Sequence, residues 1–159
     1  MHCLKSDKQI HKSGCAFFTE ISDLQINLQI DLQSLISIFN KTNSEKKSSI
    51  LSLGFVLDKE YPDQKLTIYI RKCDINGKSY DQYMKVNEKY DDITFSTFNK
   101  NIYSSIKKEL KKMKNIELLK KGEDDKNMKI DRYNYDKYKI SFVPGDIDDY
   151  EIIIYLKDE

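Results

Sequence analysis

The sequence has few of the residues on which many catalytic and metal sites depend. Its 159 residues include only two His and three Cys, and no Trp. The two His occur with two of the Cys near the N-terminus, at a spacing that matches no standard zinc pattern, which would normally include a closely spaced Cys pair. A nucleophile that needs a His base would have to draw it from this same polar segment. The sequence therefore predicts no metal and no cofactor, and it favours a protein that is not an enzyme. These four residues are His2, Cys3, His11 and Cys15.

Glycine is scarce and scattered, which excludes the usual phosphate-binding loops. None of the five Gly falls in a G-x-x-x-x-G-K or G-x-G-x-x-G pattern. The 26 acidic residues leave open a site of two carboxylates across a cleft, although no pair is singled out. An enzyme with a carboxylate-based site is therefore retained as an alternative.

Long hydrophobic runs are also missing. No segment approaches the roughly 18 consecutive apolar residues of a membrane span. The first residues of the given chain contain no apolar signal region. The odd number of Cys allows no complete disulfide framework, which favours reduced thiols. We therefore expect a cytoplasmic protein that does not insert into a membrane.

The sequence does contain regularly spaced apolar residues, enough for the core of one domain, and many charged residues for its surface. Charged residues make up 33% of the chain, above the roughly 25% of an average protein, yet the net charge is only +1. The length fits one domain. We predict a flexible N-terminal arm over residues 1–15 and a single α+β domain over residues 16–159.

In the N-terminal part, residues 23–32 alternate strictly between apolar and polar, as in a strand with one buried face. A helix is a rival interpretation, because several apolar residues of segment 21–39 also follow a 3.6-residue period. We favour a strand that passes into a helix over Leu32–Lys41, with Asp31 as its N-cap. Residues 41–49 are predicted to be a solvated loop.

Three strands are predicted next, in a meander. The first lies in the alternating apolar stretch 50–57 and the second in segment 66–71. The Asn76-Gly77 pair predicts a type I′ hairpin, because both residues tolerate positive φ. The third strand is expected over residues 79–86.

A single long amphipathic helix is predicted over Phe98–Lys114, capped by Ser96 or Thr97. Its apolar positions recur at steps of four, four, four and three residues, and its polar face is rich in Lys. The apolar positions are Phe98, Ile102, Ile106, Leu110 and Met113.

Three more strands are expected over residues 128–133, 138–143 and 150–156. The last is apolar on both faces, which predicts a central strand covered on both sides. The predicted fold is thus an α+β antiparallel sheet of about five to seven strands in two meanders, with the long helix and the shorter one on one face.

Charge is segregated along the chain. Residues 100–121 contain eight Lys and two Glu, whereas residues 144–159 contain six acids and one Lys. The acidic turn before the last strand would be held in place by a rigid strand, as recognition loops commonly are. We predict that it contacts a protein partner with a basic surface, together with two Tyr of the preceding strand region. These residues are Asp146, Asp148, Asp149, Tyr150, Tyr133 and Tyr135.

The favoured function is therefore a small intracellular protein-binding module, for example an inhibitor or an immunity-type protein that neutralises a toxin. The immunity label is an analogy only, because no sequence signature supports it. A nucleic-acid-binding accessory protein is the alternative, with phosphate contacts from the Lys-rich helix and stacking on the two Tyr. The near-zero net charge makes it the less favoured of the two. Its contact residues would be Lys107, Lys108, Lys111 and Lys112.

Overall fold

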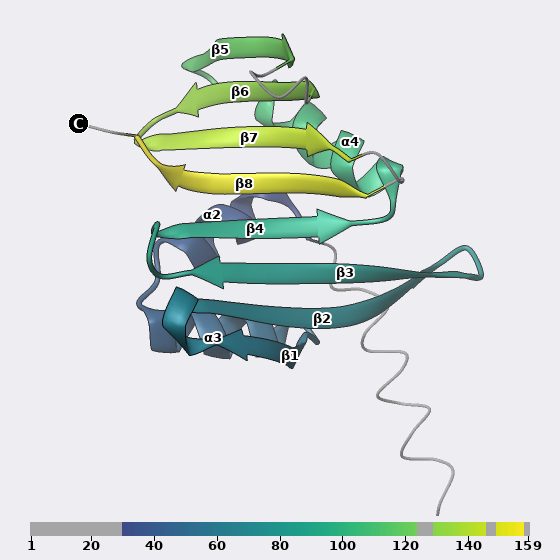
Figure 1. Ribbon diagram of the computed structural model, residues 1–159. Coiled ribbons are helices and arrows are strands. Elements are labelled where there is room, and N and C mark those ends of the chain that lie inside the picture. The colour runs from purple at the N-terminus through teal and green to yellow at the C-terminus, as the bar shows by residue number, and fades with distance from the viewer. Residues whose placement is uncertain (1–29, 124–128, 146–148, 158–159) are drawn as a thin grey trace, which may run out of the picture.

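The computed structural model describes residues 30–123, 129–145 and 149–157, and these residues form one sheet with helices packed against it (Figure 1). The sheet has eight strands, and all neighbouring strands are antiparallel. Its order is β1-β2-β3-β4-β8-β7-β6-β5, so that each set of four strands pairs in chain order and β4 joins β8 at the centre. The strands are β1 (Val56–Tyr61), β2 (Leu66–Ile75), β3 (Lys78–Asn87), β4 (Asp92–Thr97), β5 (Ile116–Glu123), β6 (Lys129–Tyr135), β7 (Tyr138–Pro144) and β8 (Tyr150–Leu156).

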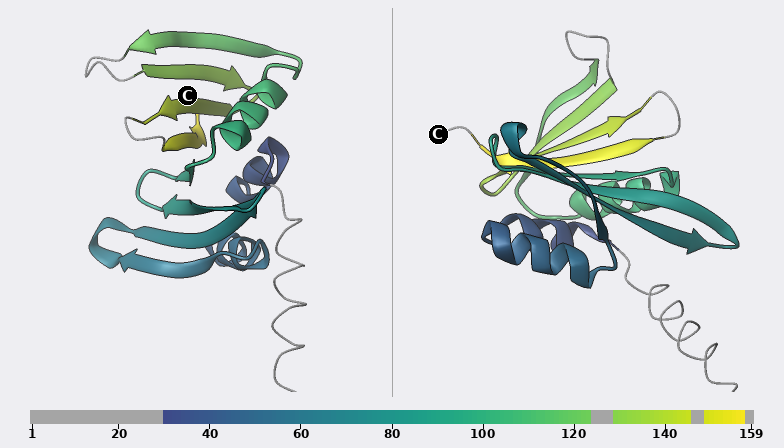
Figure 2. Two further views of the ribbon diagram at one scale, coloured as in Figure 1. Left: turned by 90° about the vertical axis from the view of Figure 1, so that its right-hand side faces the viewer. Right: turned by 60° about the horizontal axis from the view of Figure 1, so that its bottom comes forward.

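The three helices of the described chain all lie on one face of the sheet (Figures 1 and 2). They are α2 (Leu32–Phe39), α3 (Asn43–Ser52) and α4 (Lys100–Leu110). We call this side the helix-bearing face and the other side the second face. A row of side chains across the strands fills the space under the helices, because residues paired in register point the same way. That row is Tyr69, Met84, Phe95, Ile152 and Phe142, and all five are buried.

The prediction of a mixed fold with an antiparallel sheet is confirmed, and so are several local features. Asp31 is the N-cap of α2, and its carboxylate accepts a hydrogen bond from the Ser34 amide at 2.7 Å. Asn76 and Gly77 both have positive φ, at 51° and 75°, in the hairpin between β2 and β3. The sheet has more strands than predicted. No helix in the described part of the chain is long and apolar enough to cross a membrane.

The predicted loop over residues 41–49 is wrong, because helix α3 occupies most of it. Thr42 and Glu45 form a capping box that starts this helix. Only Lys46 and Ile50 are buried along it, so it has almost no apolar periodicity to read. Lys46 buries its stem and places its ammonium 5.2 Å from the centre of the Phe39 ring. The stretch 50–57 is consequently split between the end of α3 and the start of β1.

The helix predicted over Phe98–Lys114 is present, but it is shorter than predicted and is not the one long helix of the fold. Helix α4 has 11 residues, comparable to the 10 of α3, and Asn99 is its N-cap rather than Ser96 or Thr97. The predicted cap residues belong instead to β4, a strand that was not predicted. In β4, apolar Ile93 and Phe95 alternate with Thr94 and Ser96, but the segment is too short for this alternation to stand out.

Strand β5 was missed for a different reason: it is an edge strand in which half of the residues are charged and Glu117, Leu118 and Leu119 are exposed, so it shows no apolar alternation. Strand β8 was predicted correctly, and it is central in the strand order. Described helices cover only one of its two faces. Ile153 and Tyr155 point to the second face, where no described helix lies. Residues 1–29 lie outside the described chain, and with them the predicted arm and the choice between strand and helix over residues 23–29.

Candidate functional site

Two hollows lie side by side at the end of the sheet where β4 leads into α4, and both are lined by Phe98. The first, the helix-side hollow, has a volume of about 270 Å³. The second, the sheet-side hollow, has a volume of about 290 Å³. The helix-side hollow is lined by Tyr80, Phe98, Asn99, Lys100, Asn101 and Tyr150. The sheet-side hollow is lined by Asp58, Lys59, Tyr61, Ile68, Tyr83, Lys85, Ser96, Phe98, Asp149 and Glu151.

Phe98 reaches this position because it lies between the end of a strand and the start of a helix. Thr97, the last residue of β4, is fully buried, and its hydroxyl accepts a hydrogen bond from the Asn99 amide at 3.2 Å. Asn99 then caps α4. The side chain between them points outward and is 41% exposed. An exposed Phe between two hollows is typical of binding surfaces, because an aromatic side chain that becomes buried when the partner binds often contributes much of the affinity.

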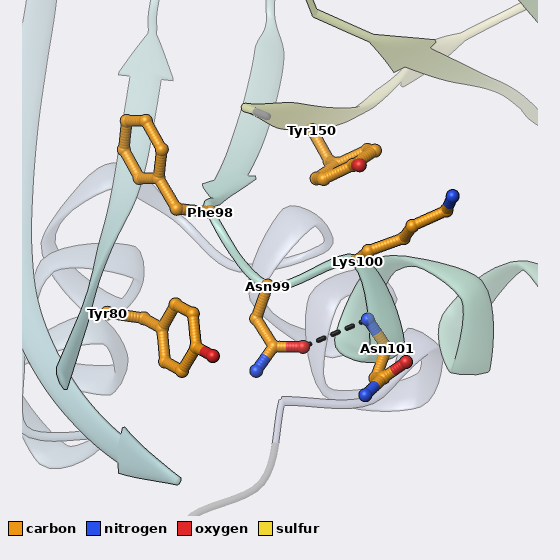
Figure 3. Close-up of a pocket in the computed structure, with 6 residues that line it drawn as sticks. All are labelled: Tyr80, Phe98, Asn99, Lys100, Asn101 and Tyr150. Atoms are coloured by element: carbon orange, nitrogen blue, oxygen red, sulfur yellow. Dashed lines mark hydrogen bonds between the residues drawn. The ribbon is translucent and has the colours of Figure 1, made fainter. Parts of the chain in front are cut away.

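The helix-side hollow combines aromatic rings with hydrogen-bond donors (Figure 3). Tyr80 comes from β3 and Tyr150 from the start of β8. Tyr150 is held against the core by Tyr103 of α4, with ring centres 4.9 Å apart. Burial, reinforced by the nearby Asp131 carboxylate, raises the pKa of Tyr103 well above its usual range. Tyr103 therefore stays neutral, and it acts here as a rigid support for Tyr150.

The lining of the sheet-side hollow includes an ion pair. The Lys85 ammonium lies 2.6 Å from a Glu151 carboxylate oxygen, and the Ser96 hydroxyl donates to the same oxygen at 3.1 Å. Because this pair neutralises itself, Asp58, Lys59 and Asp149 are the charges that remain around the hollow. The described lining is therefore slightly acidic, which suits a cationic side chain.

The position of Asp149 depends on a close contact in the turn before β8. The Gly145 amide donates to the Asp149 carbonyl at 2.6 Å. A Cβ atom at Gly145 would overlap the Asp149 carboxylate and lie 2.6 Å from that carbonyl. Glycine is required here because the backbone approaches closely.

The residues predicted to contact a partner are brought together only in part. Asp149 and Tyr150 line the two hollows, one on each side of Phe98. Asp146 and Asp148 lie outside the described residues. Tyr133 is 4% exposed and packs edge-on against the Phe142 ring, at 5.9 Å between centres. Tyr135 is half-buried against the same core.

The Lys residues of α4 do not form one uniform face. Lys107 bonds the Asp131 carboxylate at 2.6 Å and lies 5.6 Å from the centres of both the Tyr103 and Phe142 rings. Lys108, Lys111 and Lys112 are exposed. Lys107 therefore belongs to the packing between α4 and the sheet.

Metal-binding clusters of three or more His, Cys, Asp or Glu are not found within the described ranges. The predicted absence of a metal concerned His2, Cys3, His11 and Cys15, which lie outside those ranges. Sequence reasoning missed Phe98, Tyr80 and Tyr83 as surface residues, because Phe98 fits the apolar period of the following helix. The one available signal was Asn99, a strong N-cap type that would have left Phe98 outside the helix.

The chain matches no protein-family model, and no curated protein or solved structure is significantly similar to it.

Proposed function

We propose that this protein is a binding module for another protein, and that Phe98 is the centre of its docking surface. The observation that carries the proposal is the exposed Phe98 ring between two hollows, with Tyr61 and Tyr83 lining one and Tyr80 and Tyr150 the other. Tyr and Phe are enriched at protein interfaces, where large rigid rings bury area at a low entropic cost.

The chemistry of the sheet-side hollow indicates what kind of partner fits. Asp58 and Asp149 line it together with the Lys85–Glu151 pair. A partner that inserts a Lys or Arg side chain beside Phe98 would gain both the apolar contact and charge complementarity. The predicted partner with a basic surface is therefore retained, with Asp149 and Tyr150 as its contacts.

An inhibitor of the immunity type is one form such a module can take, and it stays an analogy. A cytoplasmic location is part of the same proposal, and it is supported by Cys73, the Cys of the described chain, which is a free thiol. The nucleic-acid alternative gains less from the geometry, because Lys107 is bonded to Asp131 and Tyr133 has little exposed surface for stacking. For the enzyme alternative, Asp58 and Asp149 line the sheet-side hollow, but Glu151 there is paired with Lys85, which suits binding of a cation better than acid–base chemistry.

The test compares two exposed aromatic residues at opposite ends of the same strand. Phe98 follows β4, and Tyr90, which is 66% exposed, precedes it. A partner captured with the wild-type chain would be purified, and its affinity measured for wild type, Phe98→Ala and Tyr90→Ala. We expect Phe98→Ala to weaken binding by at least about tenfold, as for an interface hot spot. Tyr90→Ala is expected to bind like wild type.

Equal affinities for wild type and Phe98→Ala would contradict the proposal. Thermal unfolding of both variants provides the stability control, since neither side chain is part of the core.

A further inference from the structure

We infer that the helix-side hollow is a socket for a carboxylate side chain, Asp or Glu, of the partner protein. This inference rests on the proposed function and adds a second contact to it. Phe98 would then separate a hollow that receives a cation from one that receives an anion. The Asn99 side chain lies between Tyr80 and the start of α4 in this hollow (Figure 3).

Asn99 is almost fully buried, at 6% exposure, and only half of its amide group is used within the described chain. Its oxygen accepts hydrogen bonds from the Asn101 and Ile102 amides, at 2.9 and 3.3 Å. Its nitrogen has no hydrogen-bond partner among the described residues. Figure 3 shows this nitrogen turned away from the helix, on the side of Tyr80. The nitrogen is accessible from the hollow although the residue is nearly buried, so a ligand oxygen that enters the hollow can accept a hydrogen bond from it.

The electrostatics of the hollow favour an anion. None of its six described lining residues is acidic, and Lys100 contributes one positive charge. The N-terminus of α4, a helix of 11 residues, adds a partial positive charge of about half a unit. The hydroxyl groups of Tyr80 and Tyr150 are further donors.

The arrangement of donors favours a carboxylate over a phosphate. Phosphate sites at helix N-termini depend on several free backbone N–H groups. Here the amides of Asn101 and Ile102 already bond the Asn99 oxygen, and the Tyr103 amide bonds the Asn99 carbonyl at 3.3 Å. The donors that remain are all side-chain groups: the Asn99 amide, the Lys100 ammonium and the hydroxyls of Tyr80 and Tyr150. The single positive charge of Lys100 balances a carboxylate better than the roughly doubly charged phosphate. The aromatic walls suit the apolar stem that carries such a group.

The occupant is inferred to be part of a protein because the hollow is continuous with the docking surface. Phe98 and Tyr150 stand at its edge, and Phe98 also lines the neighbouring sheet-side hollow. A partner that covers Phe98 therefore covers both hollows at once. Its interface should place an acidic and a basic side chain on either side of an apolar contact.

The socket can be tested without the partner, by NMR titration of the full chain with phenylacetate. Phenylacetamide is the neutral control and inorganic phosphate the competing anion. The signals to follow are the Asn99 side-chain amide and the backbone amides of Lys100 and Asn101. We expect saturable shifts with phenylacetate and a Kd on the order of several millimolar, as for a ligand of this size. Phenylacetamide and phosphate should bind at least about tenfold more weakly.

The decisive variant is Asn99→Asp. Asp is as good an N-cap as Asn, so the helix keeps its cap while the free donor becomes an acceptor. We expect the melting temperature to be retained and phenylacetate binding to fall at least about tenfold. Lys100→Gln should weaken binding, whereas Lys111→Gln, at the far end of α4, should not.

Equal binding of phenylacetate and phenylacetamide, tighter binding of phosphate, or unchanged binding by Asn99→Asp would each overturn the carboxylate socket. These outcomes are separate from the Phe98 test. If Phe98→Ala weakens binding of the partner while phenylacetate does not bind, the carboxylate socket is wrong and the docking proposal stands. If phenylacetate binds at Asn99 while Phe98 has no effect on a partner, the docking proposal fails and the carboxylate site stands.

Discussion

The two faces of the sheet are built by the same strands but are chemically different. In β4, buried Ile93 and Phe95 point to the helix-bearing face, whereas Thr94 and Ser96 point to the second face. In β8, Ile152 and Ile154 are under the helices, whereas Glu151 faces the other way. The helix-bearing face therefore contributes most of the hydrophobic stabilisation, and the second face is free to carry polar groups.

The edge strands of the sheet also differ from its central strands, because their pairing is irregular. Both outer strands contain a β-bulge, at Asp58 in β1 and at Leu119 in β5. Bulges and charged side chains are the usual means by which an edge strand avoids pairing with another chain. Backbone pairing along an edge is therefore disfavoured, and the edge strand β1 contributes to the proposed docking surface only through side chains that line the sheet-side hollow, such as Asp58 and Tyr61.

The largest effect should come from comparing two neighbours in β4. Phe95→Ala removes a fully buried ring from the helix-bearing face and should lower the free energy of unfolding by about 3–5 kcal/mol. Ser96→Ala removes one hydrogen bond to Glu151 on the second face and should cost about 1 kcal/mol. Chemical denaturation of both variants measures the difference. Equal losses would mean that the second face contributes to stability as much as the first.

A smaller effect is expected at the turn that holds Asp149. Gly145→Ala places a Cβ atom against the Asp149 carboxylate and carbonyl, so the turn must move. We expect a loss of about 1–3 kcal/mol, typical of overpacking, together with shifted NMR signals of Asp149 and Tyr150. Gly77→Ala is a contrasting control, because its Cβ meets nothing within 4 Å and only the positive φ opposes it. That variant should destabilise the hairpin without moving Tyr150. Unchanged Asp149 and Tyr150 signals in Gly145→Ala would show that the turn does not fix the docking surface.

Sequence reasoning predicted the parts of the fold that have a strong local pattern. Strands β2 and β3 were predicted from alternation and the Asn76-Gly77 turn, and α2 from Asp31 and its apolar period. Helix α3 was missed because its only buried positions are Lys46 and Ile50. Burial of Lys46 is set by the tertiary contact with Phe39 and by an ion pair with Asp91 at 3.4 Å. No local pattern contains that information.

The candidate site was predicted in part, for a related reason. Asp149 and Tyr150 were selected because an acidic turn precedes a rigid strand. Phe98 was assigned to the helix core, because the period of α4 extends back to it. Its exposure depends on where β4 ends and on the cap at Asn99. The hollow around it depends on the pairing of β4 with β8, which joins residues more than 50 positions apart.

The smallest expected effect concerns a charge near the second face, at Asp92. Burial raises the pKa of Asp92 above its ordinary value of 3.8, and the neighbouring Asp91 carboxylate adds to the shift. The folded state therefore holds this proton at pH values where the unfolded chain has already lost it. Stability should fall as pH rises through this range, and ionised Asp92 should cost stability at pH 7.

Asp92→Asn removes that cost. At pH 7 we expect a gain of less than about 1 kcal/mol in the free energy of unfolding, shrinking as the pH approaches 3.8. Asp74→Asn is the matched control: Asp74 is an exposed residue of β2, so replacing its carboxylate should give no gain. Urea unfolding at pH 7 and pH 4 measures both variants. A loss of stability in Asp92→Asn would mean that the ionised carboxylate makes net favourable interactions, and a gain that does not change with pH would mean that its charge is not the cause. The second face would then tolerate charge at no cost, and its polar character would say nothing about what it binds.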